Sequence, residues 1–375
     1  MSTDELKRTA FDEVQREADA EWTDWEGWAW AADFGDAVAE HQATRTACNL
    51  WDESPLRKWD MHGPDALALA DALFTNDMAA LERGQVRYGA ICDEHGKMLM
   101  DGTVFNVSDG HCLSVTSYDS DLQWFRQVGS DRGLEVEVTD ITSQRPHLQV
   151  QGPLARDVLR PITRGVDVDT LRYFRFVADG VTVAGVPVWL SRTGYSGELG
   201  FELYCRPEDA RELWNAVVAA GEPHGLRPIG LSAIETLRIE SGLLFPDVDY
   251  FPHQTDPFEV RLDKVVKLDG SDFVGRDALA QIAAQGTARL LTSLRIDGDE
   301  VPEYGAAVTV DGAEAGIVRS PCQSPTFGGV IAMAAIDRAL AAESTPVQVA
   351  IGDGTVEATV ASFPLYDPSK ARPRG

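Results

Sequence analysis

The sequence predicts an α+β protein built of three lobes, and three patterns support this prediction. Residues 85–118 alternate strand-like runs with turn signals at Glu94-His95-Gly96 and Asp109-Gly110, which is typical of an antiparallel meander. Residues 206–221 and 228–242 carry apolar side chains at helical spacing. From about residue 285 the chain consists of short strands with Gly, Pro and Asp turns, which indicates a separate C-terminal β-barrel domain.

The remaining elements complete the first two lobes. Residues 4–21 predict a polar helix, and the tryptophans that follow at 22, 25, 28 and 30 indicate a core, a domain seam or a substrate pocket. Helices are expected over 62–84 and 119–130, and a strand over 147–152. GPDALALADAL and GPLARDVLRPI both place Gly-Pro before a helix, so two similar units of split β-α-β type are expected.

The composition favours a cytoplasmic protein that binds neither nucleic acid nor a membrane. Of the 375 residues, 60 are acidic and 33 basic, giving a net charge of −27, which repels polyanions. There is no apolar run of bilayer-spanning length, and the acidic N-terminal stretch is unlike a signal peptide. Only six of the basic residues are lysine, a pattern that favours a halophilic source, the alternative being an ordinary acidic cytosolic protein.

The spacing of cysteine and histidine predicts no metal site. The five cysteines and seven histidines are dispersed, and neither CxxC nor HExxH occurs. Such cysteines suit a reducing compartment as buried thiols.

The stretch RTGYSGELGFELY (192–204) holds the strongest candidate binding residues. Strand alternation puts Phe201 and Leu203 on one face and Glu202 on the other. If the apolar face packs on the core, Glu202 points to a ligand, although a solvent-facing glutamate is the usual reading of such a residue. Tyr195 stands in a Gly-rich turn, where backbone and ring can approach a planar ligand.

Five stretches in order resemble the aminomethyltransferase family, which contains the glycine cleavage T-protein and tetrahydrofolate-dependent demethylases. These stretches are FTNDMAALERGQVRYGAICDEHGKMLMDG, VQGPLA, RTGYSGELGFELY, TDPFEVRLDKVVKLDGSDFVGRDAL and SPTFGGVIAMA. The resemblance implies a three-domain cloverleaf around a central folate cleft, with a jelly-roll-like C-terminal barrel.

The resemblance also implies a domain division and site roles. Domain 1 would comprise residues 1–50 and 155–262, domain 2 residues 51–154, and the barrel residues 285–375. Asp101, which could otherwise be a turn residue, falls on the family's catalytic aspartate. Tetrahydrofolate would be bound by Tyr88, Tyr195, Glu202 and Arg372. Tyr88 could equally belong to the core, and Arg372, in KARPR, could belong to a basic tail.

Departures from the T-protein pattern lie on the substrate side. LWDESPLRKW replaces FDVSHM, Ile234 stands where the T-protein has a cofactor-holding arginine, and VTSYDSDLQW resembles the demethylases. We therefore expect a one-carbon transferase acting on a small methyl or aminomethyl donor, with a preference for a demethylase. The alternatives are the T-protein itself, which would need a lipoyl carrier protein, and a non-catalytic folate-binding protein. The latter is disfavoured because DYFPHQTDPFE lacks the cysteine of that group.

Overall fold

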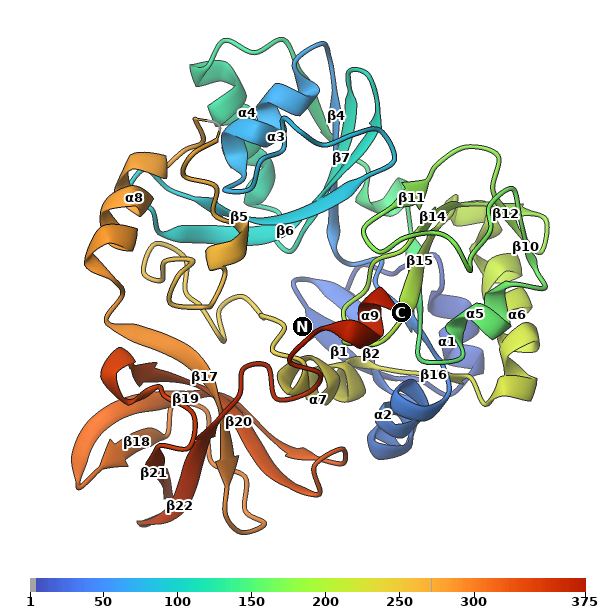
Figure 1. Cartoon of the computed structure of the whole chain (residues 1–375). Helices are drawn as coiled ribbons and strands as arrows, with labels where there is room; N and C mark the ends of the chain where they lie inside the picture. Colours follow the sequence, from blue (N-terminus) through green and yellow to red (C-terminus); the bar gives the residue numbers. More distant parts are fainter. Residues whose placement is uncertain (1–4, 271) are drawn as a thin grey trace.

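The computed structural model describes residues 5–270 and 272–375, which form three lobes grouped around the middle of the molecule (Figure 1). Two lobes each contain a mixed or antiparallel sheet with helices, and the third is a closed barrel. The predicted α+β class and the C-terminal barrel are therefore confirmed.

The first lobe is built on a six-stranded sheet with strand order β11-β14-β15-β9-β3-β16. One face of this sheet packs on a large apolar core that includes Leu50, Val150, Phe201 and Leu203. The strands are β3 (Asn49–Asp52), β9 (His147–Gln151), β11 (Phe176–Val177), β14 (Trp189–Ser191), β15 (Gly200–Tyr204) and β16 (Arg227–Pro228). The helices are α1 (Asp12–Glu17), α2 (Ala37–Thr46), α5 (Ala155–Leu159), α6 (Ala210–Gly221) and α7 (Leu231–Glu240). A small sheet of β10 (Thr163–Arg164), β12 (Thr182–Val183) and β13 (Val186–Pro187) lies in the same lobe.

The N-terminal segment differs from the predicted helix over 4–21. The helix α1 is shorter, and Asp19, with a φ of +58°, turns the chain out of it; residue 4 lies outside the described residues. The tryptophans form a hairpin of β1 (Glu21–Trp25) and β2 (Trp28–Asp33). Its two-residue turn, Glu26-Gly27, has positive φ at both positions, which matches the twist of a tight hairpin.

The second lobe holds the predicted meander in a five-stranded antiparallel sheet with order β5-β6-β7-β4-β8. Helices α3 (Ala66–Leu73) and α4 (Asp121–Asp131) pack with Trp59, Met61 and Val104 on one face. The strands are β4 (Arg57–His62), β5 (Val86–Cys92), β6 (Met98–Ser108), β7 (His111–Thr116) and β8 (Glu137–Asp140).

The boundary predicted between residues 154 and 155 falls after β9. That strand, however, is hydrogen-bonded to β3 and β15 of the first lobe, so the chain enters the first sheet again by residue 147. β-sheet hydrogen bonding therefore groups residues 147–151 with the first lobe.

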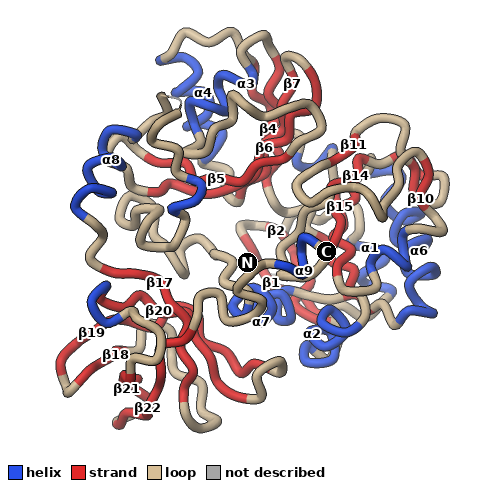
Figure 2. Tube along the Cα trace, viewed as in Figure 1, coloured by secondary structure: helices blue, strands red, loops and turns tan. Residues whose placement is uncertain are grey.

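The third lobe is a closed barrel with order β17-β20-β19-β18-β21-β22. Its strands are β17 (Arg289–Ile296), β18 (Ala307–Val310), β19 (Ala313–Ser324), β20 (Gly329–Asp337), β21 (Pro346–Ile351) and β22 (Gly354–Ala361). The connection from α7 to α8 (Arg276–Gln285) is mostly loop in Figure 2, and its Tyr250, Val260 and Val266 pack between the second lobe and the barrel. After β22 the chain leaves the barrel and ends in α9 (Ala371–Arg374) near the first lobe.

Glu240, at the end of α7, joins the first lobe to the barrel. Its carboxylate accepts hydrogen bonds from Arg45 Nη2 (2.7 Å) and from Ser324 Oγ (2.5 Å), and lies 3.0 Å from His41 Nε2. Burial alone would raise the pKa of Glu240, but His41 and Arg45 outweigh burial and hold this pKa at about 2. The ionised form is thus the one that the fold stabilises.

None of the helices within residues 5–270 and 272–375 combines the length and the hydropathy needed to span a bilayer.

Replacing Glu240 by Gln is expected to lower the free energy of unfolding by about 3 kcal/mol near neutral pH, since a pKa lowered from 4.5 to about 2 contributes on that order. The contribution is present above the unfolded-state pKa and is lost as the pH falls from about 4.5 towards 2. The difference between wild type and Glu240→Gln should therefore shrink over that window. Urea unfolding at several pH values measures it.

The matched control is Glu343→Gln, at an exposed glutamate in the turn before β21. It should change stability by less than about 0.5 kcal/mol. A difference for Glu240→Gln that grew towards acid pH would contradict the assignment.

Candidate active site

The sheets of the first and second lobes face each other, and their contact is apolar at one end. The Tyr204 ring on β15 lies 5.8 Å from Phe105 on β6, and Phe105 lies 5.1 Å from Phe176 on β11. Leu113 and Val115 of β7 join the same cluster. Strand alternation then decides which polar side chains share these two facing surfaces.

On the second-lobe surface, Asp101 is held by two tyrosines. Asp101 and Phe105 lie on the same face of β6, because four positions separate them. Tyr88 Oη, on the neighbouring strand β5, donates to Asp101 Oδ2 (2.7 Å). Tyr250 Oη, from the loop after α7, donates to Asp101 Oδ1.

The surroundings of Asp101 make its carboxyl a candidate for proton transfer. Burial raises the pKa of Asp101, and the hydrogen bonds from Tyr250 and Tyr88 offset part of that rise because they favour the ionised form. Both phenols are themselves kept protonated, because burial and the Asp101 charge raise their pKa values well above the usual range. Asp101 therefore has two fixed donors and a proton affinity above that of an exposed aspartate.

On the first-lobe surface, Glu202 occupies the position predicted by strand alternation. Phe201 and Leu203 point into the apolar core, and Glu202 lies on the opposite face, only 9% exposed. Tyr204 Oη donates to Glu202 Oε2 (2.7 Å). Burial raises the pKa of Glu202, while the hydrogen bonds from Tyr204 and Thr193 act in the other direction.

A second buried carboxyl group, Glu53, lies beside Glu202. Burial, followed by the charge of Glu202, holds the pKa of Glu53 well above its usual range. His147 Nε2 is 3.5 Å from Glu53 Oε2, and His147 is neutral because burial lowers its pKa well below 6.5. Lys58 is fully buried nearby, donates to the Ser54 and Leu56 carbonyls (2.8 Å each), and has its pKa lowered by burial to about 7. Burial thus disfavours a charge on both carboxyl groups of the Glu53–Glu202 pair, and the charge of Glu202 disfavours it further on Glu53.

A row of polar side chains crosses this surface beside Glu202. Gln149 on β9 is paired in register with both Glu202 on β15 and Trp51 on β3. Gln149 Oε1 accepts the Tyr195 N–H (3.0 Å), which fixes the amide. Within the part of the chain that the structure describes, Gln149 Nε2 and Trp51 Nε1 are buried donors without a hydrogen-bond partner. Buried donors are normally paired, so these two suit a ligand that presents acceptors.

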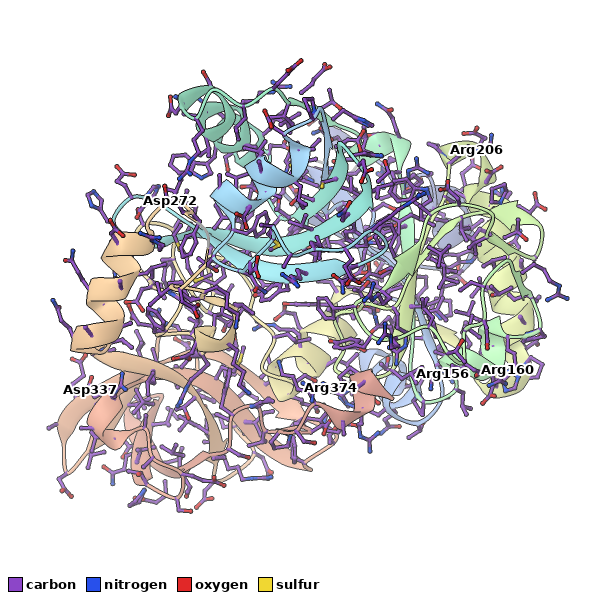
Figure 3. All side chains as sticks on the ribbon, turned by 45° about the horizontal axis from the view of Figure 1, so that its top comes forward. Arg156, Arg160, Arg206, Asp272, Asp337 and Arg374 are labelled. Carbon is purple, nitrogen blue, oxygen red and sulfur yellow. The ribbon has the colours of Figure 1, made fainter. Side chains whose placement is uncertain are left out.

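Tyr195 belongs to the same surface, whereas Arg372 lies apart from it. Tyr195 packs with Trp30 and Trp51, and its Oη donates to the Leu244 carbonyl (2.5 Å). Arg372, on α9, is 3.4 Å from Glu198 Oε2, lies over the Tyr366 ring, and has about half of its side chain exposed. Figure 3 shows the neighbouring Arg374 towards the middle of the molecule.

The sequence-predicted residues thus form two groups. Asp101 and Tyr88 are in direct contact, Glu202 and Tyr195 share the opposing sheet through Gln149, and Arg372 contacts neither group. Sequence reasoning missed Tyr250, Glu53 and Gln149. The adjacent acidic pair Asp52-Glu53 in LWDESPL was the one signal available for these three residues.

The residues present fit a planar heteroaromatic ring. Glu202 offers acceptors, while Gln149 Nε2 and Trp51 Nε1 offer donors, and all lie on one sheet surface opposite Asp101. A pterin edge carries both N–H donors and a ring carbonyl, so the pattern is complementary.

Comparisons with known proteins agree with this arrangement. Residues 11–270 match the model of the GCVT N-terminal domain, and residues 289–367 match the glycine cleavage T-protein C-terminal barrel domain. The chain belongs to the aminomethyltransferase family. It is accordingly an enzyme, a transferase of a folate-dependent family, as the sequence predicted.

Individual relatives carry two different names. Trimethylamine-oxide aldolase of Ruegeria pomeroyi is 38% identical over 90% of this chain, which spans only 44% of that protein's length. Aminomethyltransferase of Halalkalibacterium halodurans is 35% identical, with 96% of this chain and 98% of the relative covered. The solved aminomethyltransferase T of Bartonella henselae superposes with a TM-score of 0.87 at 25% identity, over 97% of this chain and 99% of that one.

Replacing Tyr250 by Phe is expected to raise the pKa of Asp101 further, by about one unit, because it removes a hydrogen bond that favours the ionised carboxylate. ¹³C NMR titration of protein labelled at the aspartate side-chain carboxyl measures this pKa, with Asp101→Asn used to assign the resonance.

Tyr304→Phe, at an exposed tyrosine before β18, should leave the Asp101 titration unchanged. A fall in the pKa of Asp101 in Tyr250→Phe would refute the role given to this phenol.

Proposed function

We propose that this protein transfers a one-carbon group, methyl or aminomethyl-derived, from a small donor to tetrahydrofolate, and that its donor is a methylated compound, which makes it a demethylase. The observation that carries the proposal is the pairing of two buried polar surfaces. One presents Glu202 together with the Gln149 amide and Trp51 indole donors, which have no partner among the described residues, and the other presents Asp101 between two phenols. Membership of a tetrahydrofolate-dependent family supports a pterin as the ring that binds here.

In this proposal, the first-lobe surface binds the pterin. Glu202 accepts two adjacent N–H groups of the ring in a charge-assisted pair. Gln149 Nε2, fixed by the Tyr195 N–H, donates to the ring carbonyl. Burial and the charge of Glu202 both favour the protonated form of Glu53, which limits the negative charge that faces the ligand. Tyr195 and Trp51 provide aromatic surface against the ring.

On the opposite surface, Asp101 orients the nitrogen that receives the one-carbon group. Bound tetrahydrofolate supplies the nucleophilic nitrogen that receives the carbon. The Asp101 carboxylate, positioned by Tyr88 and Tyr250, accepts a hydrogen bond from this nitrogen and can take up the proton that it loses. Since Asp101 is buried and its pKa is raised, it can also return this proton to a leaving amine. Its two phenol contacts limit its motion, which lowers the entropic cost of the correct geometry.

The demethylase preference is supported by a departure from the T-protein pattern. Ile234, in place of the T-protein arginine, is fully buried against Trp30 and Trp51. An apolar side chain thus stands at the position where a T-protein has an arginine, so this chain departs from the T-protein pattern in its core.

A second candidate is the T-protein activity itself, favoured by the relatives named aminomethyltransferase that match over nearly their whole length. A lipoyl carrier protein would then be a partner.

For the folate tail we propose Arg372, which has half of its side chain exposed.

Titration with tetrahydrofolate in high salt, followed by tryptophan fluorescence and calorimetry, tests the binding surface. Wild type should bind, and Glu202→Gln should bind about 10- to 100-fold more weakly, since a lost charge-assisted hydrogen bond costs ~1.5–3 kcal/mol. Glu357→Gln, on the barrel strand β22, is the matched control and should bind normally. A wild-type protein without affinity for tetrahydrofolate would remove the basis of the proposal.

Measuring turnover with candidate donors tests two points. It shows whether Asp101 acts in the chemical step or in binding, and it shows which class of donor the protein uses. Asp101→Asn is expected to bind tetrahydrofolate within about twofold of wild type but to lose at least about 100-fold in turnover, the scale of a general acid–base contribution. Chromatography of the folate products decides the donor class. Methyltetrahydrofolate supports a demethylase, whereas methylenetetrahydrofolate formed with an aminomethyl-lipoyl carrier would favour the T-protein.

A further inference from the structure

One group of metal-ligating side chains in the described part of the chain lies apart from Asp101 and Glu202: Asp60, His62 and His111. Asp60 and His62 are two positions apart on β4, so they share a face. His111 starts β7 and is paired in register with His62. Strand pairing thus brings together residues that are about 50 positions apart in the sequence.

The three side chains are in direct contact with one another. His62 Nε2 lies 2.8 Å from Asp60 Oδ2, and His111 Nε2 lies 2.7 Å from Asp60 Oδ1. The two imidazole rings are stacked, with centroids 3.9 Å apart and planes 21° from parallel. One ligand atom from each residue lies within 4.8 Å of the other two. Donor atoms about 2.1 Å from one ion are about 3–4 Å from one another, so the spacing of these atoms is close to that around a shared ion, which the two imidazoles reach by turning out of their stack.

The cluster is partly exposed to solvent, and neighbouring side chains pack against it. His62 has 55% of its side chain exposed, whereas Asp60 and His111 have 14% and 18%. Trp189 packs against the His111 ring at 6.3 Å. Glu137, exposed on β8, is paired in register with His62 and offers a further carboxylate. The positive charge of Arg145 interacts with Asp60 and would repel a metal cation bound there. The guanidinium of Arg145, however, lies over the Trp189 ring, 4.4 Å from its centroid.

We propose that Asp60, His62 and His111 form a binding site for a divalent transition metal, with Zn²⁺ as its representative. Two imidazole nitrogens and one carboxylate oxygen are donors that suit Zn²⁺, Ni²⁺ and Cu²⁺ and disfavour Mg²⁺ and Ca²⁺, which require oxygen ligands. On binding, each neutral imidazole would present its Nε2 lone pair to the metal and have its hydrogen on Nδ1, and the contacts between Nε2 and Asp60 would give way to bonds to the metal. Water completes the coordination. The site does not depend on the proposed one-carbon transfer.

Calorimetric titration of the full chain with ZnCl₂, in a buffer that does not chelate, tests the site. Wild type should bind one Zn²⁺ per chain with a dissociation constant in the micromolar range, and MgCl₂ should give no heat of binding at the same concentration. Each of His62→Ala and His111→Ala should weaken Zn²⁺ binding at least tenfold. Circular dichroism of each variant verifies the fold. Asp60→Asn, which keeps the size of the side chain and removes its charge, should also weaken Zn²⁺ binding.

His95→Ala is the matched control, because His95 is an exposed histidine next to a carboxylate, Glu94, outside the cluster. It should retain wild-type affinity. Co²⁺ absorption provides a second measurement: wild type should show the d–d bands of a protein-bound ion, and His62→Ala should lose them. If His95→Ala weakens binding as much as His62→Ala, or if all variants bind like wild type, the metal is adventitious only and the proposal is overturned.

Discussion

The buried carboxylate of Glu240 is the contact on which the placement of the first lobe against the barrel depends. Arg45 and His41 approach it from α2, and Ser324 and Thr326 approach it from the barrel. Two residues earlier along the same helix, Arg238 donates to Asp249 and to Ser320 of β19. These ionic groups are costly to bury unless all partners are present, so one arrangement of α2, α7 and the barrel is strongly favoured over others. The loop after α7 is fixed by the same network, and it delivers Tyr250 to Asp101.

In the candidate active site, unlike around Glu240, buried polar groups are only incompletely paired. Glu53 and Glu202 place two carboxyl groups together, and Gln149 and Trp51 keep donors unpaired within the described ranges. Such groups reduce stability, because burial without a partner costs free energy. The apolar contact of Tyr204, Phe105 and Phe176 at the other end of the same interface offsets this cost. Stability and recognition are thus divided along one interface between two sheets.

Strand pairing also explains why the sequence pattern did not indicate Asp60, His62 and His111 as a group. The sequence shows seven histidines without a metal-binding spacing, and the prediction of no metal site rested on that spacing. Antiparallel pairing of β4 with β7 sets His62 opposite His111 regardless of their separation along the chain. A ligand set assembled across strands has no local signature.

The sequence by itself determined the family, the α+β class, the C-terminal barrel and the outward position of Glu202, since these follow from ordered motifs and from the two-residue period of a strand. It also marked Asp101 and Tyr88, which are in contact. Only the tertiary structure decided that Tyr250 completes the Asp101 site, that Gln149 lies between Trp51 and Glu202, and that Arg372 contacts Glu198 instead of the two sheets. It likewise decided that the tryptophan segment is a hairpin. The physical reason is that periodicity and turn chemistry act over a few residues, whereas partners across sheets and lobes are selected by the packing and charge pairing of the whole fold.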